Sequence, residues 1–456
     1  MKPQTSMSGQ IDQAAMPSRR KSFNGRKYAL TVIGALLAPI LLMLALFKRD
    51  DLVYKRFVLT ILVTIYGSTF IIVEGQDGWV HQMRVYFFYM DMTFSQFMSD
   101  LWLMLRFQLP ESNMRDVYQH TVSYLTGSVL GMPRLFFPII AFVYGWFFSG
   151  AVLEVLKNFR PGSFNYVVIA FVAIFLLIKN VEGINTVRTW SGFWVLMYAC
   201  LRYYSTGKLR YALLMFTPPL FHVAYFVMAV PAWLILLMGD RKKLLAIAFV
   251  LSSVTTFIPA GTATDFFTQT ELGEHQVRAY YRDQTIDAAE MLTIRVSGGD
   301  RWYRAFERAK VHHWALNVLV YVLIFSGAYS FLMSKFQSKI FSIGLLTLTL
   351  ANSLWYFSAL NNRLTVIGAM FCIGAFIMAR TDPARARQFV RLPGFYRQGL
   401  HLSLLLYFPY CVWALSHFLD FPSFFTFFVP FVVWMDPDLT LSVKEALRWL
   451  FVNPNR

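Results

Sequence analysis

The 456-residue chain contains few cysteines and few charged residues. Its three cysteines, Cys200, Cys372 and Cys411, each fall inside an apolar stretch, which excludes a disulfide framework and a cysteine-based metal site. Charged residues make up only 15% of the chain, whereas a soluble domain carries about a quarter. Hydrophobic residues make up 57% and aromatic residues 18%. This composition predicts an all-α, polytopic integral membrane protein.

The chain also lacks an internal repeat and a linker that would separate a second domain. We expect a disordered basic tail over residues 1–27, one membrane domain over 28–436 and an interfacial C-terminal helix within 437–456. About 11 segments are apolar over a length that crosses the hydrocarbon core as a helix. They lie near residues 28–47, 57–73, 132–150, 164–178, 190–204, 244–260, 313–332, 340–358, 364–379, 398–419 and 422–435.

The formal net charge of +17 comes mostly from short connections between these segments. Such clusters are typical of cytoplasmic loops and of contact with anionic lipids, so we expect membrane lipids as partners and no nucleic acid. If the basic segment 380–397 lies inside, the connections 334–339 and 240–243 also lie inside, and the polar segments 74–131 and 261–312 lie outside.

This alternation of sides places the N-terminus outside, although residues 1–27 are strongly basic and favour the cytoplasm. Two explanations stay open at this level. Either the first apolar stretch, which contains Pro39, does not fully cross the membrane, or the number of spans is off by one.

The stretch from Ala212 to Gly239 has basic residues on both flanks. Its 28 residues would form one helix of about 42 Å, longer than one crossing and too short for two. Pro218 and Pro219 interrupt it and remove two N–H donors. We expect a re-entrant or broken helix pair with His222 near the turn; the alternative is one long tilted helix with a kink.

Polar side chains gather beside this turn. If a helix begins near Gly183, Asn185 and Arg188 share one of its faces, at the outer mouth of the next span and on the same side as His222. An amide, a permanent cation and an imidazole beside an outward cavity suit an anionic or polyhydroxylated ligand. An ionisable group at membrane depth is a functional candidate.

These residues resemble those of a known family, the EpsG/Wzy-type bacterial exopolysaccharide and O-antigen polymerases. Members of that family carry an Asn-x-x-Arg pattern that opens a helix, then a basic connection, then a Phe-His pair about thirty residues on. Here the pattern spans residues 180–240, at Gly183, Asn185, Arg188, Lys208 and Phe221-His222.

Two further segments resemble the family. Gly75-Gln76-Asp77 resembles an early Gly-x-Asp, and Arg363 resembles an arginine that opens a late span. His81 stands where the family tends to have a tyrosine. The resemblance implies that the chain joins polyprenyl-diphosphate-linked oligosaccharide units on the outer face of the inner membrane. A chain-length regulator or an export complex is then a further partner, and no cofactor or metal is needed.

The chemistry of the residues is compatible with this reaction. A diphosphate leaving group needs fixed positive charge, for which Arg188 or Arg363 is suited. The acceptor hydroxyl needs a general base, for which His222 or Asp77 is suited, and Asn185 is suited to bind the substrate. In the outer segment 261–312, arginines alternate with aromatic residues in a way that suits diphosphate and sugar, for example at Arg278 and Arg282.

Each of these residues has a simpler interpretation. Arg188 and Arg363 would anchor helix ends at the headgroups, Asn185 would cap a helix, and His222 would be a hydrogen-bonded structural histidine. Asp77 would be solvated, and the segment 261–312 would be an amphipathic helix on the membrane. Two other protein classes also remain, a transporter of lipid-linked oligosaccharides and a membrane O-acyltransferase that acts on a glycan.

Overall fold

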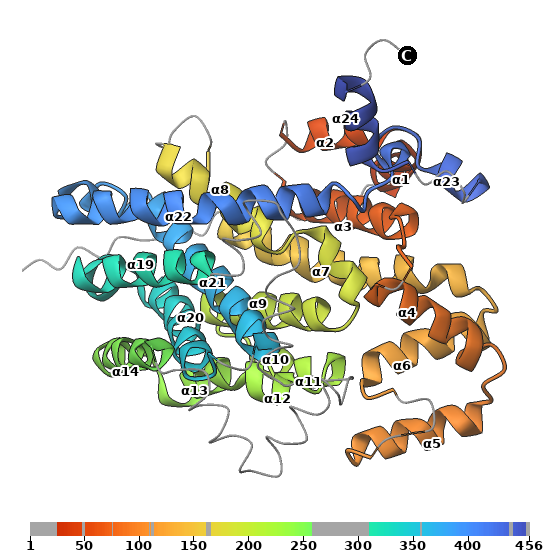
Figure 1. Ribbon diagram of the computed structural model, residues 1–456, viewed down its shortest axis with the longest axis horizontal. Helices are drawn as coiled ribbons and strands as arrows, with labels where there is room; N and C mark the ends of the chain where they lie inside the picture. The colour runs from red at the N-terminus through yellow and green to blue at the C-terminus, as the bar shows by residue number, and fades with distance from the viewer. Residues whose placement is uncertain are drawn as a thin grey trace, which may run out of the picture.

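The computed structural model describes residues 25–47, 51–74, 76–108, 110, 114–160, 166–257, 310–355, 358–436 and 441–452. Within these residues the regular structure consists of helices, with only two isolated β-bridges (Figure 1). Apolar runs without alternation favour helices in hydrocarbon, because a helix satisfies its own backbone hydrogen bonds. The prediction of an all-α fold is confirmed.

Thirteen α-helices and shorter helical turns are described between residue 25 and the end of α9 at residue 206. They are α1 (Gly25–Leu37), α2 (Pro39–Phe47), α3 (Leu52–Thr69), α4 (Asp77–Arg84), η1 (Val85–Tyr89), α5 (Phe94–Leu105), α6 (Val117–Tyr124), η2 (Leu125–Val129), η3 (Pro133–Leu135), α7 (Phe136–Val155), α8 (Tyr166–Ile178), η5 (Val181–Thr186) and α9 (Thr189–Thr206).

The second half contains a series of short helices followed by longer ones. They are α10 (Leu209–Leu214), α11 (Pro218–Phe221), α12 (Tyr225–Met228), α13 (Val230–Met238), α14 (Lys242–Val254), η6 (Thr255–Phe257), α19 (Val311–Phe325), η7 (Ala328–Leu332), α20 (Lys335–Ser353), α21 (Ser358–Thr381), η8 (Gln388–Arg391), α22 (Gly394–Phe418), η9 (Phe424–Phe427), α23 (Phe431–Met435) and α24 (Val443–Val452).

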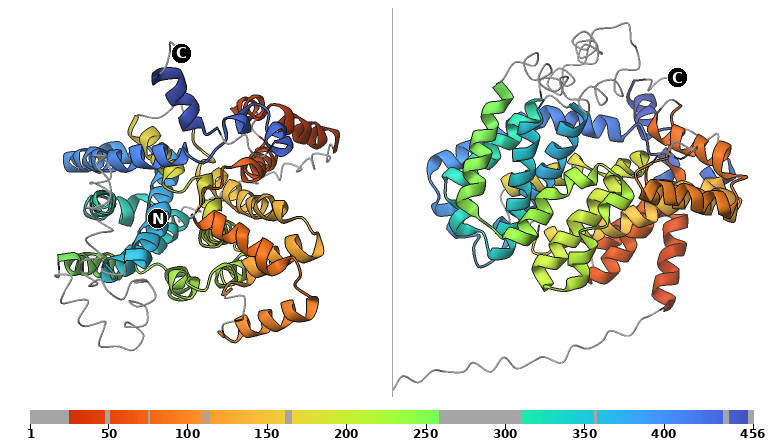
Figure 2. Two further views of the ribbon diagram at one scale, coloured as in Figure 1. Left: turned by 45° about the vertical axis from the view of Figure 1, so that its right-hand side comes forward. Right: turned by 90° about the horizontal axis from the view of Figure 1, so that it is seen from below.

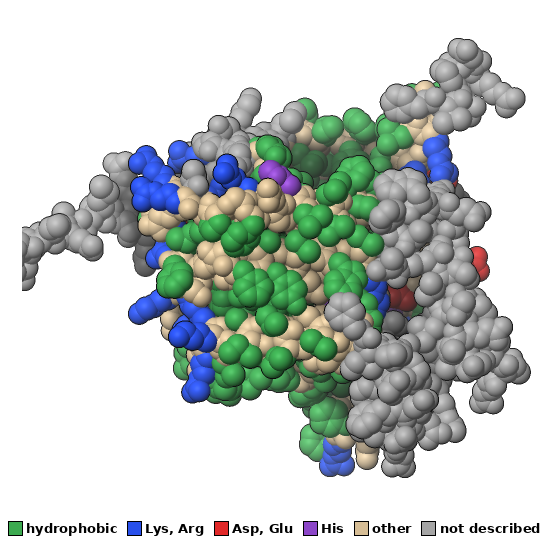
Figure 3. Space-filling view, turned by 60° about the vertical axis from the view of Figure 1, so that its left-hand side comes forward, with side chains coloured by type: hydrophobic (Ala, Val, Ile, Leu, Met, Phe, Trp, Pro, Cys, Tyr) green, Lys and Arg blue, Asp and Glu red, His purple; other side chains and the backbone are tan. Residues whose placement is uncertain are grey.

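Four helical segments of the described chain are long and apolar enough to cross a membrane: Pro133–Val155, Tyr166–Thr186, Leu360–Thr381 and Gly394–Phe418. Figure 3 shows one face of the molecule, on which apolar side chains cover the centre and Lys and Arg side chains gather toward one edge. An apolar belt with a basic border is the pattern expected of a protein in a bilayer. The chain is a membrane protein with several apolar helices.

Three predicted spans are not continuous helices, and the span predicted over 313–332 is divided at Gly327 into α19 and η7. The span predicted over 422–435 is wrong, because this segment holds only the four-residue turn η9 and the five-residue helix α23. Pro430 lies inside the segment and has no N–H to donate, which prevents one helix from running through it. The stretch 28–47 is divided into α1 and α2, which meet at Ala38 directly before Pro39.

Small residues allow the long helices to pack closely. A Cβ on Gly344 of α20 would lie 2.6 Å from the Cys372 sulfur of α21. A Cβ on Gly368 of α21 would lie 2.6 Å from the Leu348 side chain of α20. Helices in hydrocarbon associate through this kind of close backbone approach. Helix α9 lies in the middle of the packed helices and is buried without interruption over residues 189–201.

Several predicted cytoplasmic connections meet at one end of the helices, which we call the basic end. Lys242 Nζ donates to the Tyr329 and Ser330 carbonyl oxygens at 3.1 Å each, and Arg385 Nη1 donates to the Leu332 carbonyl oxygen at 3.1 Å. Helix α9 ends here, since Lys339 Nζ lies 4.9 Å from the centre of the Tyr204 ring. Helix α21 also ends here, since Gln337 Nε2 donates to Asp382 Oδ2, directly after α21, at 3.3 Å. The residues that open α9 and α21 therefore lie toward the opposite end.

The stretch 212–239 is a broken helix pair, as predicted, and the alternative of one long kinked helix is wrong. Helices α10 and α11 lead away from the basic end, and α12 and α13 lead back. The two limbs pack against each other, because Trp233 Nε1 donates to the Met215 carbonyl oxygen at 2.8 Å and its ring stacks on Phe216 at 5.4 Å. His222 follows the short helix α11 at the turn between the limbs, and the proline pair opens α11, which separates it from α10.

Candidate functional site

A buried carboxylate, Asp116, links two of the predicted site residues. Its Oδ2 pairs with Arg188 Nη1, and its Oδ1 accepts hydrogen bonds from His222 Nδ1 at 3.0 Å and from the Val223 amide at 2.9 Å. The Asp116 side chain has no exposed surface. A buried carboxylate is stable only when charged or polar partners satisfy it, as they do here.

The same partners keep Asp116 ionised. Burial raises the pKa of this carboxyl group, but the hydrogen bond and charge of His222, the charge of Arg188 and the Val223 amide lower it further, to about 2. Asp116 is therefore a carboxylate near neutral pH and can only accept hydrogen bonds.

The ionised Asp116 fixes the orientation of His222. Because a carboxylate only accepts, His222 Nδ1 carries the proton of their hydrogen bond, and a neutral ring then has its lone pair on Nε2. Nε2 faces Arg363 Nη1 at 3.4 Å, a long and weak hydrogen bond. The imidazole thus lies between a fixed anion and a fixed cation, with its basic nitrogen toward the cation.

A strained backbone turn presents Arg188 to this cluster. Val187 has φ +53°, a conformation that β-branched residues rarely adopt. Its amide donates to the Ile184 carbonyl oxygen at 2.8 Å, and its own carbonyl oxygen accepts from Ser191 Oγ at 2.5 Å. These bonds hold the break between η5 and α9, so Arg188 directly precedes α9 and its side chain extends from the start of that helix.

This break overturns one prediction from the sequence. Asn185 and Arg188 do not share the face of one helix, because Asn185 belongs to the turn η5 and Arg188 follows the break. Asn185 Nδ2 donates to Gln76 Oε1 at 3.5 Å. The Asn185 side chain therefore does not cap α9 and does not extend in the same direction as that of Arg188. A Cβ on Gly78 would lie 2.1 Å from Asn185 Oδ1, so Asn185 holds the start of α4 against η5.

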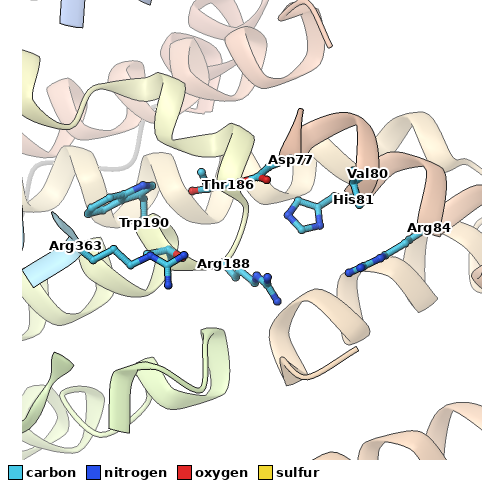
Figure 4. A pocket seen from close by; sticks show the side chains of 9 residues that line it. Asp77, Val80, His81, Arg84, Thr186, Arg188, Trp190 and Arg363 are labelled. Carbon is cyan, nitrogen blue, oxygen red and sulfur yellow. The ribbon is translucent and has the colours of Figure 1, made fainter. Parts of the chain in front are cut away.

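The break and α4 enclose a polar pocket of about 200 Å³ beside this cluster. Figure 4 shows the guanidinium groups of Arg84, Arg188 and Arg363 pointing toward one common space, with Asp77 at its edge. The lining residues carry three guanidinium groups and one carboxylate, and the Asp116 carboxylate pairs with Arg188 beside the pocket, so one positive charge remains in excess. The volume is below the roughly 300 Å³ at which drug-sized ligands begin, so it suits a small anionic group. The remaining lining residues are Val80, His81, Thr186, Thr189 and Trp190.

His81 adds no charge to this pocket. Burial lowers its pKa to about 3, and the charges of Arg188 and Arg84 add to the effect. Gln119 Nε2 lies 2.7 Å from its Nδ1, and an amide nitrogen can only donate, so Nδ1 accepts and the proton is on Nε2. His81 is therefore a neutral hydrogen-bonding group in the pocket wall.

Trp190 closes another part of the wall. It is the second residue of α9 and is 8% exposed. Lys179 Nζ lies 4.5 Å from the centre of its ring, a cation–π contact. A Cβ on Gly183 would lie 3.0 Å from Lys179 Cε and 3.2 Å from Trp190 Cβ, so glycine allows this close arrangement.

The structure brings most of the predicted site residues together. Asp77, Arg188 and Arg363 line the pocket, and His222 lies next to it through its contacts with Asp116 and Arg363. Asn185 supports the pocket without lining it. Gly75, Arg278 and Arg282 lie outside the described residues.

Sequence reasoning missed Asp116 and Arg84. Asp116 lies in a polar segment that had no motif, more than seventy residues before its partner Arg188. The only available signal was indirect: an arginine and a histidine at membrane depth need a counter-ion.

Comparison of the chain with family models, with curated proteins and with solved structures gave no match.

Proposed function

We propose that the chain is a polysaccharide polymerase of the EpsG/Wzy type in the bacterial inner membrane. It joins polyprenyl-diphosphate-linked oligosaccharide repeat units on the outer face of that membrane during synthesis of an exopolysaccharide, a capsule or an O-antigen. The observation that carries this proposal is the coupled group of Asp116, Arg188, His222 and Arg363 beside a pocket with excess positive charge.

The pocket supplies the site for the diphosphate of the donor. The Arg188 guanidinium group has five N–H donors and donates one of them to Asp116, so other N–H groups can bind a phosphate oxygen. Arg363 and Arg84 reach the same space from two other helices. When the bond between the sugar C1 and the diphosphate oxygen breaks, its electron pair stays on the diphosphate, and these cations stabilise that charge.

His222 is the general base in this proposal. Binding of the donor draws Arg363 toward phosphate and frees His222 Nε2, whose bond to Arg363 is already long at 3.4 Å. Nε2 takes the proton of the acceptor hydroxyl as that oxygen bonds to C1, and Asp116 stabilises the imidazolium formed. Asp77, at the pocket edge, is placed to accept a hydrogen bond from a sugar hydroxyl.

The placement of the pocket fits a reaction outside the cytoplasm. Arg188 and Arg363 open the helices α9 and α21, whose other ends lie at the basic end. Basic connections face the cytoplasm as a rule, so the pocket faces outward. In this multi-pass arrangement the segment 422–435 does not count as a span, so the number of spans is smaller than the predicted number of about eleven.

The division of the stretch 28–47 into two helices helps to assign the side of the membrane on which the N-terminus lies. Helix α1 has 13 residues and α2 has 9, and each is shorter than the roughly 20 residues that a crossing needs. This favours the explanation that the first stretch does not fully cross. The basic residues 1–27 then lie on the cytoplasmic side, as their charge requires.

Reconstitution tests this proposal. The purified chain is placed in proteoliposomes that contain one lipid-linked repeat unit, and the lipid products are separated by size. We expect a ladder of glycan lengths, which is lost in His222→Ala and in Arg363→Ala proteins that still elute as folded. Movement of the substrate between leaflets without extension would show a transporter instead, and acyl transfer to the glycan would show an O-acyltransferase; either result would reject the polymerase.

A further inference from the structure

Helix α5, in the segment before Asp116, exposes a stripe of large apolar side chains. Phe94 is 65% exposed, Met98 44%, Trp102 55% and Leu105 49%. At about 3.6 residues per turn, these four positions fall within roughly 80° of the helix circumference. We call this set the α5 stripe.

The α5 stripe is separate from the face by which the helix is held. Phe97 and Met104 lie about 110° around the helix from the centre of the stripe and are buried. Phe97 stacks on the Tyr124 ring of α6 at 4.3 Å and on the His120 ring at 4.7 Å. Helix α5 is thus fixed to α6 by one face, while the stripe faces away.

A polar sector borders the α5 stripe. Ser95, Ser99 and Arg106 are exposed and lie next to it around the helix. The Arg106 guanidinium lies 4.6 Å from the centre of the Trp102 ring. A tryptophan at the edge of an apolar stripe, with a cation over it, is the arrangement favoured at the boundary between headgroups and hydrocarbon.

The neighbouring turns continue this apolar surface along the chain. Phe87 and Phe88 in η1 are 77% and 53% exposed, and Met132 after η2 is 57% exposed. The two turns are in contact, since a Cβ on Gly127 would lie 2.9 Å from the Tyr89 side chain. Several large apolar side chains are therefore exposed in one part of the molecule, which in water would favour aggregation.

The direction of α5 also matters. Helix α5 lies at the edge of the molecule and runs at a steep angle to α20 and α21, as both Figure 1 and the right-hand view of Figure 2 show. Helix α21 contains the candidate span Leu360–Thr381. Helix α5 is not parallel to this candidate span, and its 12 residues are fewer than the roughly 20 that a crossing needs.

We propose that the α5 stripe is inserted into the outer leaflet of the bilayer as an interfacial helix, with lipid hydrocarbon as its occupant. The stripe, the polar sector and the short length of α5 each fit this position. Because α6 is fixed to α5, and Asp116 directly precedes α6, the inserted stripe holds this side of the pocket at the depth of the lipid headgroups. This inference stands independently of the polymerase proposal.

Depth-dependent fluorescence quenching tests the insertion. Met98→Cys carries an environment-sensitive NBD label in a Cys411→Ala background, since Cys200 and Cys372 have no exposed surface and do not label. Ser99→Cys, on the polar sector of the same helix, is the matched control. The protein is placed in nanodiscs, one chain per disc, with phospholipids that carry a quencher at the top of the acyl chain.

We expect the label at position 98 to be quenched several-fold more than the label at 99, with emission shifted to shorter wavelength. Phe94→Cys provides a second reporter on the stripe and should behave like position 98. Quenching at 94 and 98 as weak as at 99 would overturn the proposal. So would an emission shift that appears only with two chains per disc, because a second copy would then cover the stripe.

Discussion

Replacement of Asp116 by asparagine tests the coupling that defines the candidate site. Asparagine has almost the same size but no charge, and its amide nitrogen can only donate. One of the two groups now bound, Arg188 or His222, must therefore face an N–H donor instead of an acceptor. The Val223 amide competes for the single oxygen that remains.

The expected size of the effect follows from burial and role. Removal of one partner of a buried ion pair costs about 3–5 kcal/mol, and we expect the lower end, because Arg188 is 29% exposed and regains water. For the reaction, loss of a positioned general base reduces the rate about 10²–10⁴-fold. Without the carboxylate, His222 loses both its fixed tautomer and the charge that stabilises its protonated form.

The assay compares Asp116→Asn with Asp91→Asn in proteoliposomes that contain lipid-linked repeat units. Asp91 is an exposed carboxylate of the same segment, 74–131, so its replacement controls for the change in net charge. We expect Asp116→Asn to lower kcat by at least about 100-fold while Asp91→Asn stays near wild type. An Asp116→Asn protein that elutes as folded and retains kcat within about threefold of wild type would refute the reasoning.

Three further changes have defined outcomes. Arg363→Lys keeps the charge but loses the planar fork, so we expect KM for the lipid-linked donor to rise about tenfold with a smaller change in kcat; an unchanged KM would remove Arg363 from the donor site. Gly78→Ala places a Cβ 2.1 Å from Asn185 Oδ1 and should displace α4 and lower activity, whereas Gly34→Ala, with open space around it, should not; equal effects would show that α4 is not held this way. His81 has a pKa of about 3 when folded and about 6.5 when unfolded, so the unfolded state binds more protons and stability falls as pH decreases below about 6.5. His81 should lower the free energy of unfolding by up to about 1.4 kcal/mol per pH unit between pH 6.5 and 5, so the thermal midpoint of His81→Gln should fall less steeply over this range than that of wild type. A decline as steep as in wild type would contradict the assignment.

Much of the fold follows from local sequence properties. Apolar length predicted the helices α7, α8, α9, α20, α21 and α22 within a few residues, because a helix in hydrocarbon needs little besides length and hydrophobicity. The proline pair at 218 and 219 predicted the break at His222. The segment 422–435 shows where composition misleads, since it has the length and apolarity of a span but Pro430 interrupts it.

The site was predictable only in part. Arg188, His222 and Arg363 stand out because charged and polar groups are rare near the ends of apolar stretches. Asp116 does not stand out, because a carboxylate in a polar segment has no local pattern and its role arises from contacts more than seventy residues away. The positive φ of Val187, which bonds with Ile184 and Ser191 hold, is likewise not indicated by the residue type, and it separates Asn185 from Arg188.

The lipids of living cells test the central claim most directly. Cells that lack the chain are complemented with wild type or with Asp116→Asn, and their lipid extracts are analysed by mass spectrometry. We predict that wild type restores long glycans, while Asp116→Asn leaves a polyprenyl diphosphate that carries one repeat unit. Long glycans of normal length in the Asp116→Asn cells, with the variant present in the membrane, would contradict the account.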